Sequence, residues 1–187
     1  MMKQHDFIVY CGPMFSEKTT RLLSYIDRCK YQGRKTIAFK PIVDSRYSTS
    51  EIVTHQGAKI EAISVESGSD ILKYLSNTDE IYDTICVDEQ FMIKGSSHAL
   101  IWLFKNGFSI IVSTLDLSSK CESFSEVERI LPYTTKIEKT TAICTVCGKD
   151  ARYTYKKIDN IDIICIGGSE SYEPRCFDHH PLMVSEE

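Results

Sequence analysis

The chain has 187 residues, of which 42% are hydrophobic and 26% are charged, so it can bury one globular core and a small appendage. A net charge of −4 excludes the strongly basic surface by which proteins bind nucleic acids non-specifically or coat membranes. We therefore expect a small-molecule substrate, with no nucleic acid and no membrane among the partners.

The beginning of the chain, MMKQHDFIVYCGP, contains only a short apolar run that ends at a Gly-Pro turn. No apolar stretch in the sequence reaches transmembrane length, so we expect a cytoplasmic protein. Five of the eight cysteines stand singly in apolar or loop segments. They are predicted to be reduced and mostly core residues, and they are Cys11, Cys29, Cys86, Cys121 and Cys165.

Apolar runs of strand length alternate with segments of helical periodicity through residue 116. We predict strands at 6–11, 35–40, 84–89 and 108–116, an alternating segment at 58–65, and helices at 19–33, 70–75 and 96–107. This alternation indicates an α/β fold of the P-loop type, with a mainly parallel sheet flanked by helices. Ligands bind such sheets outside the carboxyl ends of the strands, so the functional site is expected there.

The pattern of the sequence changes after about residue 138, where no helical periodicity follows. The segments TTAICTVCGKDARYTYKK, IDIICIGG and YEPRCFDHH are short and β-prone, and turn signals separate them. We predict a nucleotide-binding domain at 1–137 and a small zinc-ribbon-like β lobe at 138–187. A lobe of about 50 residues buries too little apolar surface to be stable alone and usually needs a metal or disulfides.

The stretch GPMFSEKTT follows the first predicted strand and opens the first predicted helix. It matches the phosphate-binding loop G-x-x-x-x-G-K-[ST], except that Glu17 replaces the second glycine. In such loops backbone N–H groups cradle phosphates, a lysine neutralises the transferred group and a hydroxyl holds Mg²⁺. Lys18 and Thr19 would take the last two roles, with an ordinary strand-to-helix turn as the alternative. The predicted nucleotide-binding residues are Gly12, Pro13, Met14, Phe15, Ser16, Glu17, Lys18, Thr19 and Thr20.

An acidic pair, Asp88 and Glu89, ends the buried strand of TICVDEQF. Asp88 could reach Mg²⁺ through water, and Glu89 could face the hydroxyl that accepts a phosphoryl group. Acidic residues at a strand end often form only a solvated turn. The functional interpretation therefore requires that the pair lies beside the phosphate loop.

Two ligand pairs in the C-terminal lobe predict a metal site. Cys144 and Cys147 have the spacing of a thiolate pair on one tight turn, and Cys176 and His179 form a second pair. Three thiolates and one imidazole suit tetrahedral structural Zn²⁺, and a cytoplasmic setting argues against disulfides. His180 is an alternative fourth ligand. A redox-active Cys-x-x-Cys pair, or cysteines that are simply reduced core residues, would also account for this spacing.

In chain order, these motifs resemble the zinc-containing type II thymidine kinase family. The similarity covers nearly the whole chain and is carried by GPMFSEKTTRLL, FKPIVDSRYS, VTHQG, CVDEQF, STLDLSSKCESF, EKTTAICTVCGKDARYT and IGGSESYEPRCFDHH. The resemblance implies transfer of the γ-phosphate of ATP to the 5′-hydroxyl of thymidine, with Mg²⁺ on the phosphates and structural Zn²⁺ in the lobe. It also implies a homotetramer.

The resemblance also assigns roles to single residues. Glu89 matches the general base, Asp88 the acid on the Mg²⁺ side, and Arg46 an arginine that stabilises charge on the phosphoryl group. Lys18 completes the catalytic set. The residues matching positions that enclose the nucleoside are Met14, Phe91, Leu115, Phe124, Thr154, Ile163, Ile166, Gly167 and Tyr172.

Four departures from the family pattern lie near the expected chemistry. Glu17 replaces a glycine, DEQF is one residue shorter than D-E-x-Q-F, Ser119 replaces an aromatic residue, and Lys120 replaces Arg or Gln. These changes predict a kinase of low activity. A non-catalytic nucleoside-binding or oligomerising relative is the main alternative. A zinc-ribbon nucleic-acid module is the weakest, because the chain is acidic and its basic and aromatic residues form no stripe.

Overall fold

Six parallel strands form the sheet on which the rest of the chain is arranged. The computed structural model describes residues 5–44, 50–54, 57–157 and 167–184. The strand order is β5-β2-β6-β7-β1-β8, and each neighbouring pair is parallel. The strands are β1 (Phe7–Cys11), β2 (Thr36–Pro41), β5 (Ile63–Val65), β6 (Thr84–Val87), β7 (Ser109–Thr114) and β8 (Lys136–Lys139).

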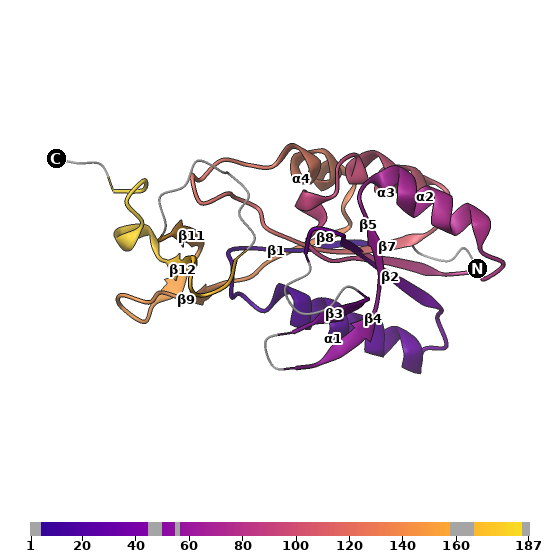
Figure 1. Ribbon diagram of the computed structural model, residues 1–187, viewed down its shortest axis with the longest axis horizontal. Helices are drawn as coiled ribbons and strands as arrows, with labels where there is room; N and C mark the ends of the chain where they lie inside the picture. Colours follow the sequence, from indigo (N-terminus) through magenta and orange to yellow (C-terminus); the bar gives the residue numbers. More distant parts are fainter. Residues whose placement is uncertain (1–4, 45–49, 55–56, 158–166, 185–187) are drawn as a thin grey trace.

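Side chains of the buried strands alternate between two apolar cores, as the period of a strand requires. In β1, Phe7 and Val9 face one core and Ile8 and Tyr10 face the other. Helices α2 (Gly68–Asn77), α3 (Ser96–Lys105) and α4 (Ser125–Ile130) cover the first face. Helix α1 (Lys18–Tyr31) and the hairpin of β3 (Glu51–Val53) and β4 (Lys59–Glu61) cover the second (Figure 1).

Helix α1 follows the predicted pattern closely. Leu22, Leu23, Ile26 and Cys29 recur at helical spacing and are all buried against the sheet. The chain leaves the helix through Gly33, whose φ of 68° is left-handed and favours glycine. Because β1 ends at Cys11 and α1 begins at Lys18, the phosphate motif spans the connection between them.

The C-terminal lobe lies at one end of the sheet, on the left in Figure 1. Its described residues form two antiparallel strand pairs and a short 3₁₀ helix, η3 (Phe177–His179). The strands are β9 (Ala142–Ile143), β10 (Asp150–Ala151), β11 (Tyr153–Lys156) and β12 (Tyr172–Arg175). Two further 3₁₀ helices, η1 (Gln90–Met92) and η2 (Leu131–Tyr133), belong to the larger part.

These features confirm the predicted fold class. Strand β8, which our sequence analysis did not predict, includes both residue 137 and residue 138 and pairs with β1. The division into two domains at that point stays a prediction. In the part of the chain that the structure describes, no helix combines the length and the apolar character needed to cross a bilayer.

Candidate active site and metal cluster

The phosphate loop leaves β1 at Gly12, where the backbone φ is 150°. A Cβ atom at this position would lie 2.5 Å from the Thr140 carbonyl oxygen, a distance that no side chain can adopt. Only glycine therefore allows the chain to pass this point. The loop then opens α1, whose first N–H groups form the positive end of the helix dipole and suit an anion.

Lys18 is buried at the start of α1, with its ammonium inside the loop. Nζ donates to the Pro13 carbonyl oxygen at 2.5 Å and lies 3.5 Å from Ser16 Oγ. Burial lowers the pKa of Lys18, and the nearby carboxylates of Glu89 and Asp88 oppose this effect. The arrangement places one positive charge between the loop and the acidic pair.

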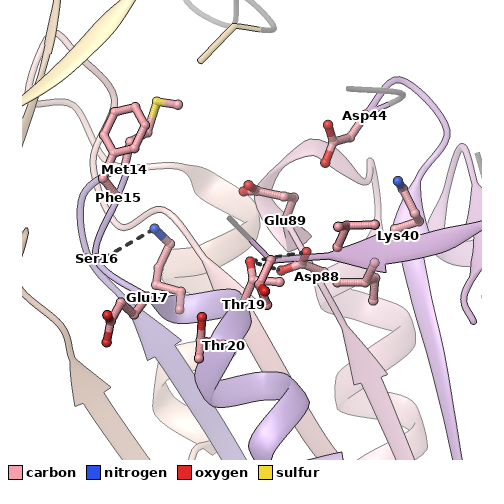
Figure 2. A pocket seen from close by; sticks show the side chains of 14 residues that line it. Met14, Phe15, Ser16, Glu17, Thr19, Thr20, Lys40, Asp44, Asp88 and Glu89 are labelled. Carbon is pink, nitrogen blue, oxygen red and sulfur yellow. Dashed lines mark hydrogen bonds between the residues drawn. The ribbon is translucent and has the colours of Figure 1, made fainter. Parts of the chain in front are cut away.

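Asp88 follows the buried strand β6 and reaches the first turn of α1. Thr19 Oγ1 lies 3.2 Å from Asp88 Oδ1 (Figure 2). Ser113 Oγ, at the end of β7, donates to the same oxygen. Burial raises the pKa of Asp88 to about 7, and the Glu89 carboxylate contributes, while the hydrogen bonds from Ser113 and Thr19 oppose the shift. A buried carboxylate beside a hydroxyl is a donor set that suits a divalent cation.

Glu89 occupies a left-handed backbone position, with φ of 48°, directly before η1. Its side chain lines the same cavity as the phosphate loop, Lys40, Asp44 and Asp88. Figure 2 shows Glu89 between the phosphate loop on one side and Lys40 and Asp44 on the other. The predicted acidic pair and the predicted phosphate loop therefore belong to one site.

Glu17 stands at the glycine position of the motif with φ of 61° and ψ of 21°. The left-handed conformation expected there is present, although the residue has a Cβ. Its side chain is exposed, and Figure 2 shows its carboxylate pointing away from Asp88 and Glu89. Direct repulsion between this carboxylate and a phosphate in the loop is thereby reduced, whereas backbone strain remains.

Sequence reasoning missed several side chains around the loop. Lys40 lines the cavity and donates to the Glu51 carbonyl oxygen at 3.2 Å, and Asp44 lies beside it. Both belong to FKPIVDSRYS, so this motif was a signal for them. Ser113 and Thr140 carried no signal, because only the packing of strands distant in sequence brings them to Asp88 and to Ser16.

The four predicted metal ligands converge in the C-terminal lobe. The ligand atoms of Cys144, Cys147, Cys176 and His179 all lie within 4.8 Å of one another. Cys147 Sγ and Cys176 Sγ are 3.6 Å apart, and Cys176 Sγ is 3.1 Å from His179 Nδ1. Four ligands at Zn²⁺ bond lengths of about 2.0–2.3 Å on a tetrahedron are separated by about 3.3–3.8 Å, so the cluster fits zinc.

The charges of the cluster also favour a cation. Burial raises the pKa of the Cys144 thiol, but backbone N–H groups of Cys176, Val146 and Cys147 outweigh burial and lower it to about 6. Burial and the neighbouring thiols raise the pKa of Cys176. Three adjacent thiolates repel one another unless a metal ion binds them.

His180, the alternative ligand, faces away from this cluster. Its Nε2 atom lies 3.3 Å from the Thr154 carbonyl oxygen, and its Nδ1 atom lies 3.8 Å from Cys121 Sγ. Burial lowers the pKa of this imidazole, and the contact with the Thr154 carbonyl oxygen opposes the shift only in part. The geometry therefore favours His179 as the fourth ligand.

Comparison with known proteins decides the family. The family model described as thymidine kinase matches residues 5–180. The chain belongs to the thymidine kinase family. A curated relative, the thymidine kinase of Thermococcus kodakarensis, is 39% identical over 182 residues, which cover 92% of each chain. Family membership indicates a phosphotransferase and does not favour the non-catalytic alternative.

Among the described residues that are predicted to enclose the nucleoside, two pairs are in contact. Phe91 and Phe124 pack with ring centroids 4.5 Å apart, and the backbone N–H of Met14 donates to Thr154 Oγ1 at 3.0 Å. Tyr172 is buried in β12, and Leu115 follows β7. Gly167 begins the last described segment, whereas Arg46, Ile163 and Ile166 lie outside the described residues. The roles of these residues stay predictions.

Proposed function

We propose that the chain transfers the γ-phosphate of ATP to the 5′-hydroxyl of thymidine. Family membership supports the reaction class, and the named relative supports the nucleoside. One observation carries the assignment to these residues: Thr19 of the phosphate loop contacts Asp88, and the buried Lys18 ammonium lies beside them. The phosphate loop, the Lys18 ammonium and the Asp88 carboxylate therefore lie together at the carboxyl ends of the strands, as phosphoryl transfer requires.

The proposed step assigns one task to each residue. Glu89 accepts the proton of the 5′-hydroxyl while that oxygen forms a bond to the γ-phosphorus. The bond between this phosphorus and the bridging oxygen breaks, and ADP leaves with the electron pair. Lys18 stabilises the charge that develops on the phosphoryl oxygens, and Arg46 is proposed to assist it. Proton transfer of this kind typically contributes about 10²–10⁴-fold to the rate.

Thr19 and Asp88 are the residues proposed to hold Mg²⁺. Their hydroxyl and carboxylate oxygens lie together at the start of α1 and are the hard ligands that this ion prefers. When bound, Mg²⁺ would neutralise negative charge on the phosphates. Ser113 donates to Asp88 and so keeps the carboxylate oriented toward Thr19.

The C-terminal cluster is proposed to bind one structural Zn²⁺ through Cys144, Cys147, Cys176 and His179. These ligands come from the two ends of the lobe and frame the segment that carries Gly167 and Tyr172. We propose that the segment closes over the thymine base. We further propose that the protein is cytoplasmic and forms a homotetramer. Its activity is proposed to be low because of the backbone strain at Glu17.

The decisive experiment is phosphorylation of labelled thymidine by purified protein with ATP and Mg²⁺. Omission of ATP and the Glu89→Gln variant serve as controls, and ATP binding is measured in parallel by calorimetry. We expect thymidine 5′-phosphate to form only when ATP is present, and to form far more slowly with Glu89→Gln than with the parent protein. Protein that binds zinc and ATP but forms no product would contradict the proposal and support the non-catalytic alternative.

A further inference from the structure

Two residues of the phosphate loop hold left-handed backbone conformations although neither is glycine. Phe15 has φ of 64° and Glu17 has φ of 61°. Only Glu17 occupies the glycine position of the motif. Such conformations are unfavourable for residues with a Cβ and persist only where the surrounding structure holds them. The contacts of residues 14–16 show what holds this loop.

The C-terminal lobe contacts the loop at two consecutive residues. The Phe15 side chain packs against the small core that Ala142 and Ala151 form with two of the predicted metal ligands, Cys144 and Cys176. The preceding backbone N–H, of Met14, donates to Thr154 Oγ1 at 3.0 Å. Thr154 is buried in β11, and its carbonyl oxygen lies 3.3 Å from Nε2 of His180, the residue after the predicted ligand His179.

A third contact lies where the chain enters the lobe. Thr140, between β8 and β9, is buried, and its Oγ1 atom lies 2.7 Å from Ser16 Oγ. Its backbone N–H donates to the Cys11 carbonyl oxygen at 2.7 Å. The loop is thus supported on one side by residues that follow it by 124 to 140 positions in the sequence.

We propose that the C-terminal lobe sets the conformation of the phosphate loop, with Phe15 and Thr154 as positioning residues for ATP. The inference rests on the proposed function only in taking ATP as the ligand of this loop. Because Phe15 packs against the small core to which Cys144 and Cys176 belong, a metal bound by these thiols also fixes the surface that holds the loop. Metal occupancy therefore controls ATP affinity as well as the order of the lobe.

The main test measures ATP binding by calorimetry in the absence of thymidine. Thr154→Val removes the oxygen that accepts from Met14 and keeps the shape of the side chain, whereas Thr154→Ser keeps the oxygen. Thr145→Val is the matched control, because Thr145 lies in the same lobe and contacts Pro174 instead of the loop. We expect about tenfold weaker ATP binding for Thr154→Val alone, with one zinc per chain in all three variants.

Two results would overturn the inference. One is unchanged ATP affinity in a Thr154→Val protein with full zinc content. The other is an equal loss in Thr145→Val, which would reveal general loosening of the lobe.

A second measurement compares zinc removal in the parent and in Phe15→Leu. Leucine keeps an apolar side chain but loses the ring that reaches the lobe. Chelation should weaken ATP binding in the parent by at least tenfold and by a clearly smaller factor in Phe15→Leu. Equal factors would overturn the link between metal and loop. If Phe15→Leu fails to fold, as circular dichroism would show, the Thr154 variants decide the question.

Failure of the proposed function gives a different result from failure of this inference. A protein that binds ATP through Thr154 but leaves thymidine unphosphorylated would refute the function and retain the inference. If the parent protein phosphorylates thymidine and the Thr154→Val variant binds ATP as tightly as the parent, the function is retained and the inference is refuted.

Discussion

At the scale of single residues, the conformation of Glu17 explains how the phosphate loop forms although its second glycine is replaced. Its backbone adopts the left-handed conformation that the missing glycine would adopt, and its carboxylate is exposed. A non-glycine residue in this conformation costs about 1–3 kcal/mol. Charge repulsion adds little, because the side chain is exposed and points away from Asp88 and Glu89 (Figure 2). We therefore attribute the proposed low activity mainly to backbone strain at Glu17.

We predict that Glu17→Gly tightens ATP binding and raises kcat/KM for ATP by about tenfold, which corresponds to about 1.4 kcal/mol of released strain. Zinc content should not change. Glu17→Ala is the control, because alanine removes the carboxylate but keeps the Cβ. If alanine improves ATP binding as much as glycine does, the charge and not the backbone limits this site.

Glu89→Gln tests the proposed proton acceptor. Glutamine preserves the shape of the side chain but cannot accept the proton, so kcat should fall by about 10²–10⁴-fold with little change in the Kd for thymidine. Steady-state kinetics and equilibrium binding separate the two effects. Unchanged turnover would mean that the shortened DEQF motif has moved the base, and Asp88 would be the next residue to test.

The sequence was sufficient to predict which polar residues meet, but not all of their partners. Lys18, Thr19 and Asp88 follow strands whose carboxyl ends share one edge of the sheet, so their convergence could be expected from topology. Lys40 stands in FKPIVDSRYS, a motif that indicated only Arg46. Thr140 could not be predicted, because its position beside Gly12 depends on the path of the chain after β8.

At the scale of elements, helix α3 begins with a cap that comes from another helix. Glu126 of α4 accepts hydrogen bonds from the backbone N–H groups of Gly95, at 2.9 Å, and Ser97, at 2.8 Å. Burial raises the pKa of Glu126, but the hydrogen bonds from Ser97 and Gly95 outweigh burial and lower it. A carboxylate in this position also interacts favourably with the helix dipole.

Glu126→Gln should reduce the free energy of unfolding by about 1 kcal/mol at pH 7. Because the folded state lowers the pKa, the stabilisation is complete above the unfolded value of about 4.3 and is lost as the pH falls through the folded pKa. The difference between parent and variant should therefore shrink below about pH 4. Urea unfolding at pH 7 and pH 3 measures it.

Glu128→Gln is the matched control for this prediction, because Glu128 is exposed on the same helix and its carboxylate contacts Ser123. Its effect should stay within about 0.5 kcal/mol. A Glu126→Gln deficit that is the same at both pH values would show that lost packing, and not the charge, causes it.

The elements that sequence patterns missed are short or lie at an edge. Helix α4 has only six residues, too few to show helical periodicity, and it is fixed by packing against α3 and by the contacts of Glu126. Strand β8 reads KIEK and is mostly exposed, so it lacks the apolar run of a buried strand. Strands β1, β2, β6 and β7 were predictable because both of their faces are buried.

At the scale of the whole molecule, the C-terminal lobe is expected to depend on its metal cluster. In the described part of the lobe, the apolar core consists of Ala142, Ala151 and the predicted ligands Cys144 and Cys176, with Phe15 packed against them. So small a core cannot offset the entropy of ordering the lobe, and structural zinc contributes folding free energy directly.

We predict one Zn²⁺ per chain in protein purified without chelator, as measured by elemental analysis. Chelation should lower the melting temperature and the activity, and the lobe should lose its structure before the sheet does. Cys147→Ser should abolish stoichiometric zinc, whereas Cys121→Ser, outside the cluster, should retain it. Zinc-free protein with a fully ordered lobe would contradict this prediction.

The support of the phosphate loop by Thr140 and Thr154 has a consequence for how the protein is made. During synthesis the motif from Gly12 to Thr20 emerges before its supports, because Thr140 and Thr154 follow their partners in the loop by 124 and 140 positions. Strand β1 likewise cannot form its pairing with β8 until residues 136–139 have been translated. Contacts so distant in sequence form late, because closing the intervening chain costs entropy. A nascent chain that ends before β9 therefore contains the complete phosphate-loop sequence but lacks the part of the C-terminal lobe that supports the loop.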